Sequence, residues 1–178
     1  RAARMKRQEV HQRAQGLADN YRSEKAYKDY ATVAPQYVIV RDAANDPSAA
    51  GDLSLIFSYM KILDPGSTVR EGEFANAQNS GSLPQTLVAR YNKLINGERL
   101  TAGQRSDFVS SAKRAYDSYR KQKAVIDDAY RKRAERTKVN PDDVLAPDFV
   151  SEDGGDGAAA GGSQPKRLTF NPATGELE

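Results

Sequence analysis

The chain has 178 residues, of which 38% are hydrophobic and 29% charged, with a net charge of +3, a single histidine and no cysteine. The lack of cysteine excludes disulfides, thiolate nucleophiles and cysteine-ligated zinc, and a single histidine excludes multi-histidine metal sites and histidine-based triads. The small apolar fraction favours extended helices over a sandwich or a doubly wound sheet. No signal peptide or membrane span is visible. Because the chain begins with Arg1 rather than Met, we expect processing or a longer parent polypeptide.

Residues 1–32 are predicted to form one helix. Its apolar seam has the helical spacing of three and four residues and consists of Val10, Ala14, Leu17 and Tyr21. The beginning of this helix is basic, with Arg1, Arg4, Lys6, Arg7 and Arg13. A solvated helical face is the favoured interpretation of these charges, and a phosphate-binding arm is the alternative. His11 is interpreted as one more polar position of the helix.

A second helix is predicted from Pro35 to about Asn45, because proline suits the first turn of a helix. The run of residues 37–40 is also compatible with a short strand, but no partner strand is evident nearby. Asp46 and Pro47 resemble an N-cap followed by proline at the first helical position, which would open a third helix.

The third helix contains the most apolar run of the chain, from Asp52 to Leu63, and we expect it to be the core. Only Ser54, Ser58 and Lys61 interrupt the run, and on a helix they form one narrow polar stripe. A helix that is apolar nearly all round is normally buried, so Phe57 is expected inside. Pro65 ends the helix because it cannot continue the hydrogen-bond ladder.

Helices are also predicted from Thr68, which forms a capping-box pattern with Glu71, and over residues 83–96, where Gly97 suits the left-handed position after the last turn. Thr101 and Gln104 form a second capping-box pattern. A long helix without internal proline is expected to run from there to about residue 137. Its seam is Val109, Ala112, Tyr116, Tyr119, Lys123, Ile126 and Tyr130. Such a seam is weak alone, so we expect it to pack on the first helix or across subunits.

Basic side chains gather at the end of this long helix and are the strongest candidates for contact with DNA: Arg131, Lys132, Arg133, Arg136 and Lys138. Tyr130 could stack a base beside them, although tyrosine at seam spacing is more often packed inside. A short helical turn is expected after Asn140 and Pro141.

The composition changes sharply after this turn. Residues 148–165 are predicted to be a flexible linker, because the stretch SEDGGDGAAAGGSQ has no bulky apolar residue. Within residues 166–178, residues 168–170 alternate like a strand, and Asn171-Pro172 with Gly175 can form a turn, so an extended or hairpin tail is expected. Such a tail fits docking on a partner by strand addition, anchored by Leu168, Phe170 and Leu177, although a frayed tail without a role is equally compatible.

No catalytic, cofactor-binding or metal-binding constellation is evident. Glu71 and Glu73 are two residues apart, so on a helix they point to different sides and do not form an acid–base pair. The glycines of residues 154–157 follow no predicted strand and precede no predicted helix, which argues against a phosphate-binding loop. We therefore expect no enzymatic activity, no cofactor and no small-molecule substrate.

Three strings of the sequence resemble structural proteins of tailed bacteriophage virions, of the internal DNA-ejection or tape-measure-like kind. They are DPGSTVREGEFA at residues 64–75, NGERLT at residues 96–101 and NPATGELE at residues 171–178. The resemblance implies a non-enzymatic virion protein that assembles with portal, tail or ejection components and contacts packaged DNA. It also implies location in the virion, with delivery into the host cell envelope on infection. It carries no catalytic residues.

The expected architecture is all-α: an elongated multi-helix domain over residues 1–147 that ends in a long helix, then the linker (148–165) and the docking peptide (166–178). A homo-oligomeric ring or bundle is expected. The alternative function is a soluble nucleic-acid-binding or adaptor protein that uses its basic helices.

Overall fold

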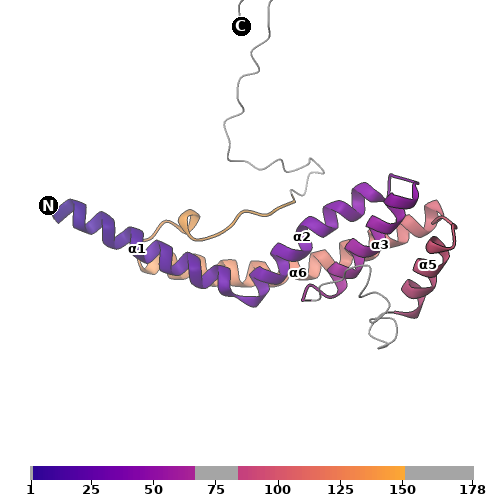
Figure 1. Ribbon diagram of the computed structural model, residues 1–178. Coiled ribbons are helices and arrows are strands. Elements are labelled where there is room, and N and C mark those ends of the chain that lie inside the picture. Colours follow the sequence, from indigo (N-terminus) through magenta and orange to yellow (C-terminus); the bar gives the residue numbers. More distant parts are fainter. Residues whose placement is uncertain (1, 67–83, 151–178) are drawn as a thin grey trace, which may run out of the picture. The chain divides into compact units, whose positions relative to one another are not determined.

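The computed structural model describes residues 2–66 and 84–150, and side chains from residue 4 onward (Figure 1). The chain divides into two units, Arg1–Asp148 and Phe149–Glu178, and all the described helices belong to the first unit. The predicted helix from Thr68, with Glu71 and Glu73, lies outside the described residues. So do the tail residues Leu168, Phe170 and Leu177.

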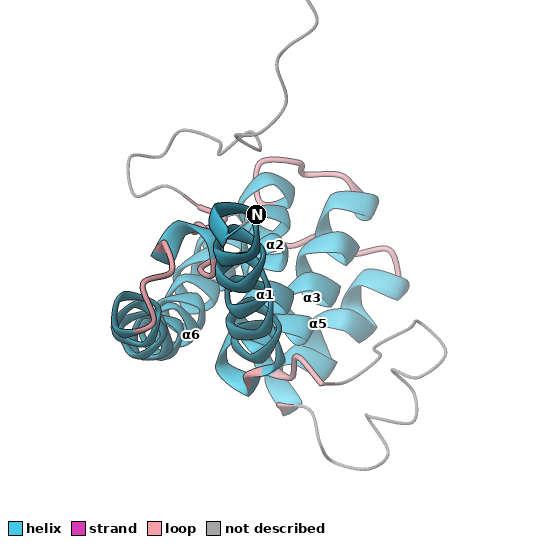
Figure 2. Cartoon of the chain, turned by 90° about the vertical axis from the view of Figure 1, so that its left-hand side faces the viewer, coloured by secondary structure: helices cyan, strands magenta, loops and turns pink. Residues whose placement is uncertain are grey.

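The described part of the chain is all-helical and contains no strand, as the sequence predicted. Its elements are α1 (Ala2–Ser23), α2 (Lys25–Ala43), α3 (Ala49–Leu63), α5 (Gln85–Ile95), α6 (Ala102–Arg136) and the short 3-10 helix η1 (Pro141–Asp143). The ambiguous run of residues 37–40 belongs to α2, so the helical interpretation is confirmed. Helix α2 packs against both α3 and α6, α5 packs against α3, and α1 packs on α2, α6 and η1. Figure 2 shows the labelled helices from the side of the N-terminus.

The first helix ends nine residues earlier than predicted. Glu24 separates α1 from α2 and has φ −59° and ψ 136°, which are not helical. The Ser23 hydroxyl donates to the backbone oxygen of Asn20 at 2.7 Å, and the Tyr130 hydroxyl donates to Glu24 Oε1 at 2.9 Å. The helix therefore breaks at a residue that also binds Tyr130 of the distant helix α6. The spacing of apolar residues along the first helix could not reveal this contact.

Pro35 lies inside α2 and does not open a helix, so that prediction was wrong. Proline removes one hydrogen bond of the helix and normally disfavours its interior position. Here, buried side chains precede and follow it along α2, including Tyr30, Val33 and Val40, each with no exposed surface. Burial of this continuous face offsets the lost hydrogen bond.

The N-cap of α3 is Ser48 rather than Asp46, which corrects the predicted start of this helix. The Ser48 hydroxyl accepts from the backbone N–H of Gly51 at 3.0 Å. Asp46 instead accepts from the backbone N–H of Ser48 at 3.0 Å and from its hydroxyl at 2.9 Å. Gly51 is required because a Cβ there would lie 2.3 Å from the backbone oxygen of Asp46.

Helix α3 is the buried core helix that its apolar composition predicted. Its aliphatic side chains with at most 1% exposure, called here the α3 core, are Leu55, Ile56, Met60 and Ile62. Ser54, Ser58 and Lys61 lie on this helix at the spacing of the predicted polar stripe, but Ser58 is buried, with 7% exposure. Phe57, which was expected inside, is only half-buried. Its ring meets the Tyr91 ring edge to face, with ring centroids 5.9 Å apart.

Helix α6 has the length and the cap that the sequence predicted. Thr101 accepts from the backbone N–H of Gln104 at 3.2 Å, and the Gln104 side chain accepts from the backbone N–H of Thr101 at 2.9 Å. The helix extends over 35 residues. Gly97, before it, has φ +92°, the left-handed conformation expected there. The predicted turn after Asn140 is η1.

The weak seams of α1 and α6 pack on one another within the chain, which is one of the two arrangements expected. Their shared cluster of buried residues is Ala14, Tyr21, Tyr130, Ala134, Val139 and Val144. Only the last part of the α6 seam takes part in this cluster, because Tyr116 of the same seam packs on α2, against Tyr30 and Tyr37.

Candidate functional site

The predicted DNA-contact residues, Arg131, Lys132, Arg133, Arg136 and Lys138, are all exposed on the last turns of α6 and just beyond them. Three of them have contacts within the chain. Lys132 Nζ lies 2.6 Å from Asp128 Oδ2, the Arg133 guanidinium lies 4.7 Å from the centre of the Tyr130 ring, and Arg136 Nε donates to the Lys132 carbonyl at 3.2 Å. The patch is therefore accessible, but part of its charge is already compensated.

Tyr130 cannot stack a base in this structure. Its side chain is 3% exposed and its hydroxyl donates to Glu24. Burial, together with the Glu24 carboxylate, raises the pKa of Tyr130 above its ordinary value. Packing inside the helical bundle, the more usual role at seam spacing, is what the structure shows.

A buried lysine organises the contact of α6 with the segment after η1. Lys123 is 2% exposed, and its ammonium donates to Asp127 Oδ2 at 2.7 Å, to Asp148 Oδ1 at 3.0 Å and to the Ala146 carbonyl at 3.1 Å. The Tyr21 hydroxyl of α1 donates to the other oxygen of Asp127 at 2.7 Å. We call Lys123, Asp127, Asp148 and Tyr21 the Lys123 cluster. It joins three segments far apart in the sequence.

The charge balance of the Lys123 cluster favours a charged lysine. Burial alone lowers the pKa of Lys123, but the hydrogen bonds and charges of Asp127 and Asp148 outweigh it, so the pKa is raised. Burial and the Asp127 carboxylate raise the pKa of Tyr21 well above its ordinary value. A buried amine activated for nucleophilic or base chemistry needs a lowered pKa, and Lys123 has the opposite shift. The cluster therefore joins α1, α6 and residues 146–148 around a charged ammonium group.

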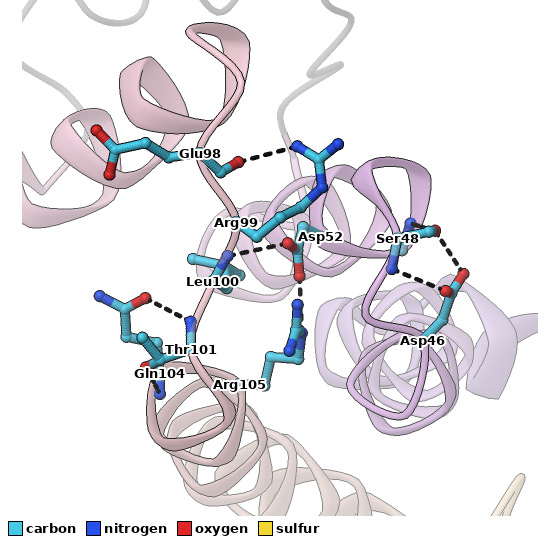
Figure 3. A network of polar contacts seen from close by, with 10 residues as sticks. Asp46, Ser48, Asp52, Glu98, Arg99, Leu100, Thr101, Gln104 and Arg105 are labelled. Carbon is cyan, nitrogen blue, oxygen red and sulfur yellow. Dashed lines mark hydrogen bonds and ion pairs between the residues drawn. The ribbon is translucent and has the colours of Figure 1, made fainter.

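A second buried ion pair joins α3 to the start of α6 (Figure 3). Asp52 has no exposed surface; its Oδ1 accepts from Arg105 Nε at 2.8 Å and its Oδ2 accepts from the backbone N–H of Leu100 at 3.0 Å. Arg105 is 8% exposed, and its Nη2 is buried without a hydrogen-bond partner. Both carboxylate oxygens are occupied, so this pair fixes the α5–α6 connection on α3.

Sequence reasoning missed both ion pairs. Asp52 was visible only as the one charge at the start of the most apolar run, and Lys123 as the one charge in a seam of tyrosines and alanines. Each signal indicated burial but did not identify the partner. Asp52 and Arg105 are brought together only by the packing of α3 on α6.

The His11 side chain is exposed on α1, and its Nε2 lies 3.0 Å from Nε2 of Gln15, so His11 is a polar surface position of the helix. Over the residues that the structure describes, no group of three acidic or histidine side chains could hold a metal ion. Nor is any helix in those ranges long and apolar enough to cross a membrane. Comparison of the chain with protein families, with curated proteins and with solved structures finds no significant match.

Proposed function

We propose that this chain is a non-enzymatic structural protein of a tailed bacteriophage virion. It acts as an internal or ejection protein, or as a tape-measure-like segment, that assembles with portal or tail components and aids genome delivery. The observation that carries the proposal is the resemblance of the strings at residues 64–75, 96–101 and 171–178 to such virion proteins.

The place of the NGERLT string in the fold supports this proposal. Gly97 adopts the left-handed conformation after α5, the backbone N–H of Leu100 binds Asp52, and Thr101 caps α6. Most of the string therefore makes one helix connection and fixes it on the core helix.

The proposed partners are other copies of this chain, the portal, tail or ejection proteins, and packaged DNA. The tail peptide with Leu168, Phe170 and Leu177 is the proposed docking element, and the stretch of about 14 residues (151–164) within the predicted linker would give it a reach of roughly 20 Å. Tethering raises the effective concentration of the peptide near its site, so a short strand could remain bound. The proposed location is the virion, with delivery into the host cell envelope on infection.

Two experiments test the proposal. Mass spectrometry of purified phage particles is expected to find this chain, and its presence in infected cells but absence from particles would contradict the proposal. Deletion of residues 166–178 is expected to leave the melting temperature of the helical unit nearly unchanged while reducing incorporation into particles. Normal incorporation of the truncated chain would reject the docking role and leave the virion assignment standing.

The alternative, a nucleic-acid-binding or adaptor protein, is favoured by the exposed basic side chains at the end of α6. It predicts DNA binding that weakens steeply with added salt, because each neutralised phosphate releases counterions. Binding without that dependence would remove the alternative.

A further inference from the structure

A cleft of about 410 Å³ lies between α5 and α6, and none of the predicted contact residues borders it. Leu87 of α5 and Phe108 of α6 are buried at 3% exposure each and form its apolar floor together with Tyr59 of α3. The Phe108 ring meets the Tyr59 ring edge to face, with centroids 5.1 Å apart. The floor is therefore packed and fixed by three helices.

Two arginines line this cleft, and neutral groups hold both of them. The Arg90 guanidinium lies 4.9 Å from the centre of the Phe108 ring, and Arg114 Nη2 donates to the Ser111 hydroxyl at 2.8 Å. In the described parts of the chain, no carboxylate lies within ion-pair distance of either guanidinium. The lysines nearby on the same two helices differ, because Lys93 pairs with Glu98 at 3.4 Å and Lys113 with Asp117 at 2.7 Å.

Among the described residues, the lining of the cleft therefore carries a net positive charge. Asp107 is its one acidic lining residue, against two guanidinium groups. A concave site with an apolar floor concentrates the field of such charges more than a flat surface does. Arginine presents a planar fork of donors that matches the oxygens of a phosphate, and the hydroxyls of Ser110 and Thr86 add donors at the same site.

We propose that this cleft binds a phosphate group through Arg90 and Arg114. The phosphate belongs either to the backbone of a nucleic acid or to a free phosphate ion, and the chemistry of recognition is the same in both. The proposal is independent of the virion assignment. It places phosphate recognition in the cleft rather than at the end of α6, where Lys132 is paired with Asp128.

The test compares two double variants of the full chain that lose the same charge. Arg90→Gln/Arg114→Gln removes both guanidiniums of the cleft, and Arg131→Gln/Arg136→Gln removes two from the end of α6. The readout is the anisotropy of a labelled DNA duplex at low salt, with inorganic phosphate or chloride as competitor at equal ionic strength. The control is expected to bind only a few-fold more weakly than the parent. The cleft variant is expected to lose at least tenfold more than the control, since tenfold corresponds to about 1.4 kcal/mol and charged hydrogen bonds contribute more than this.

Arg90 packs on Phe108, so its replacement could disturb the fold. Arg114→Gln alone avoids this, because Arg114 is exposed and its guanidinium donates to Ser111, and it is expected to weaken binding about tenfold. Phosphate that displaces the duplex better than chloride supports the site and identifies free phosphate as a ligand. If phosphate displaces the duplex no better than chloride and the cleft variants still bind the duplex weakly, the site is supported. The bound phosphate then belongs to the nucleic-acid backbone. Equal losses in the two double variants, or no binding of duplex or phosphate by the parent chain, would overturn the proposal.

Discussion

Two regions of the helical unit are held together by different kinds of contact. The α3 core consists of aliphatic side chains packed where α3 meets α2 and α6. Around the Lys123 cluster, where α1 and residues 139–148 meet α6, the buried groups are tyrosines, alanines, valines and an ion pair. Apolar burial does not depend on direction or on pH, whereas the hydrogen bonds of the cluster depend on both. We therefore expect the two regions to respond differently to substitution and to alkali.

The largest effect is expected from Asp52→Asn at the edge of the α3 core. The substitution leaves Arg105 charged, buried and without its anion, and breaking such a pair costs about 3–5 kcal/mol. Chemical denaturation measures the free energy of unfolding. The matched control is Asp128→Asn, because Asp128 forms an exposed pair with Lys132, and such pairs contribute at most about 1 kcal/mol. Similar losses in the two variants would show that Asp52 is not buried as described.

Leu55→Ala tests the α3 core itself. Leu55 has no exposed surface, so the loss of apolar burial and the cavity left behind should cost about 3–4 kcal/mol. Leu63 of the same helix is 41% exposed, and Leu63→Ala should cost less than about 1 kcal/mol. Equal losses of stability for the two variants in thermal denaturation would show that Leu55 is no more buried than Leu63.

Lys123→Met removes the cation of the Lys123 cluster and keeps an apolar side chain of comparable length. We expect a loss of about 2–3 kcal/mol. This is less than for Asp52 because Asp127 and Asp148 remain partly exposed, at 22% and 48% of their side chains. A variant as stable as the parent in urea would show that replacement by an apolar side chain is neutral here, as it is for some buried ion pairs.

The smallest effect at neutral pH is expected from Tyr21→Phe, about 1–2 kcal/mol for one hydrogen bond to a carboxylate. Above pH 10 the difference in stability between Tyr21→Phe and the parent chain should depend on pH. The pKa values of Tyr21 and Lys123 are raised in the folded chain, so the unfolded chain loses these protons first and stability falls as the pH rises. The slope approaches about 1.4 kcal/mol per pH unit for each such group. In Tyr21→Phe the free energy of unfolding should therefore fall less steeply with pH than in the parent chain. Equal slopes in the two proteins would contradict the contacts described for the Lys123 cluster.

Much of the fold could be predicted because its signals are local. Capping pairs such as Thr101 with Gln104, the left-handed Gly97 and the spacing of apolar residues are each set by neighbours in the sequence. The break at Glu24 and the unbroken helix through Pro35 could not be predicted, because both depend on contacts with distant segments.

The candidate sites divide in the same way. The exposed patch from Arg131 to Lys138 follows from composition alone. Arg90 and Arg114 were not singled out because their cleft exists only where α5 and α6 approach each other on α3. Lys123 appeared as an irregular member of a seam, and only the return of residues 146–148 to α6 reveals its three acceptors.

Hydrogen exchange of Lys123→Met against the parent chain tests the difference between the two regions most directly. Loss of about 2–3 kcal/mol from the Lys123 cluster should speed amide exchange about 30- to 150-fold over residues 139–148 and the adjacent part of α1. Amides of α3 that exchange through local opening should remain unchanged, because the α3 core does not use the cluster, whereas α3 amides that exchange only through global unfolding should speed by the same factor. Unchanged exchange over residues 139–148, or acceleration of the locally opening amides of α3, would contradict the account.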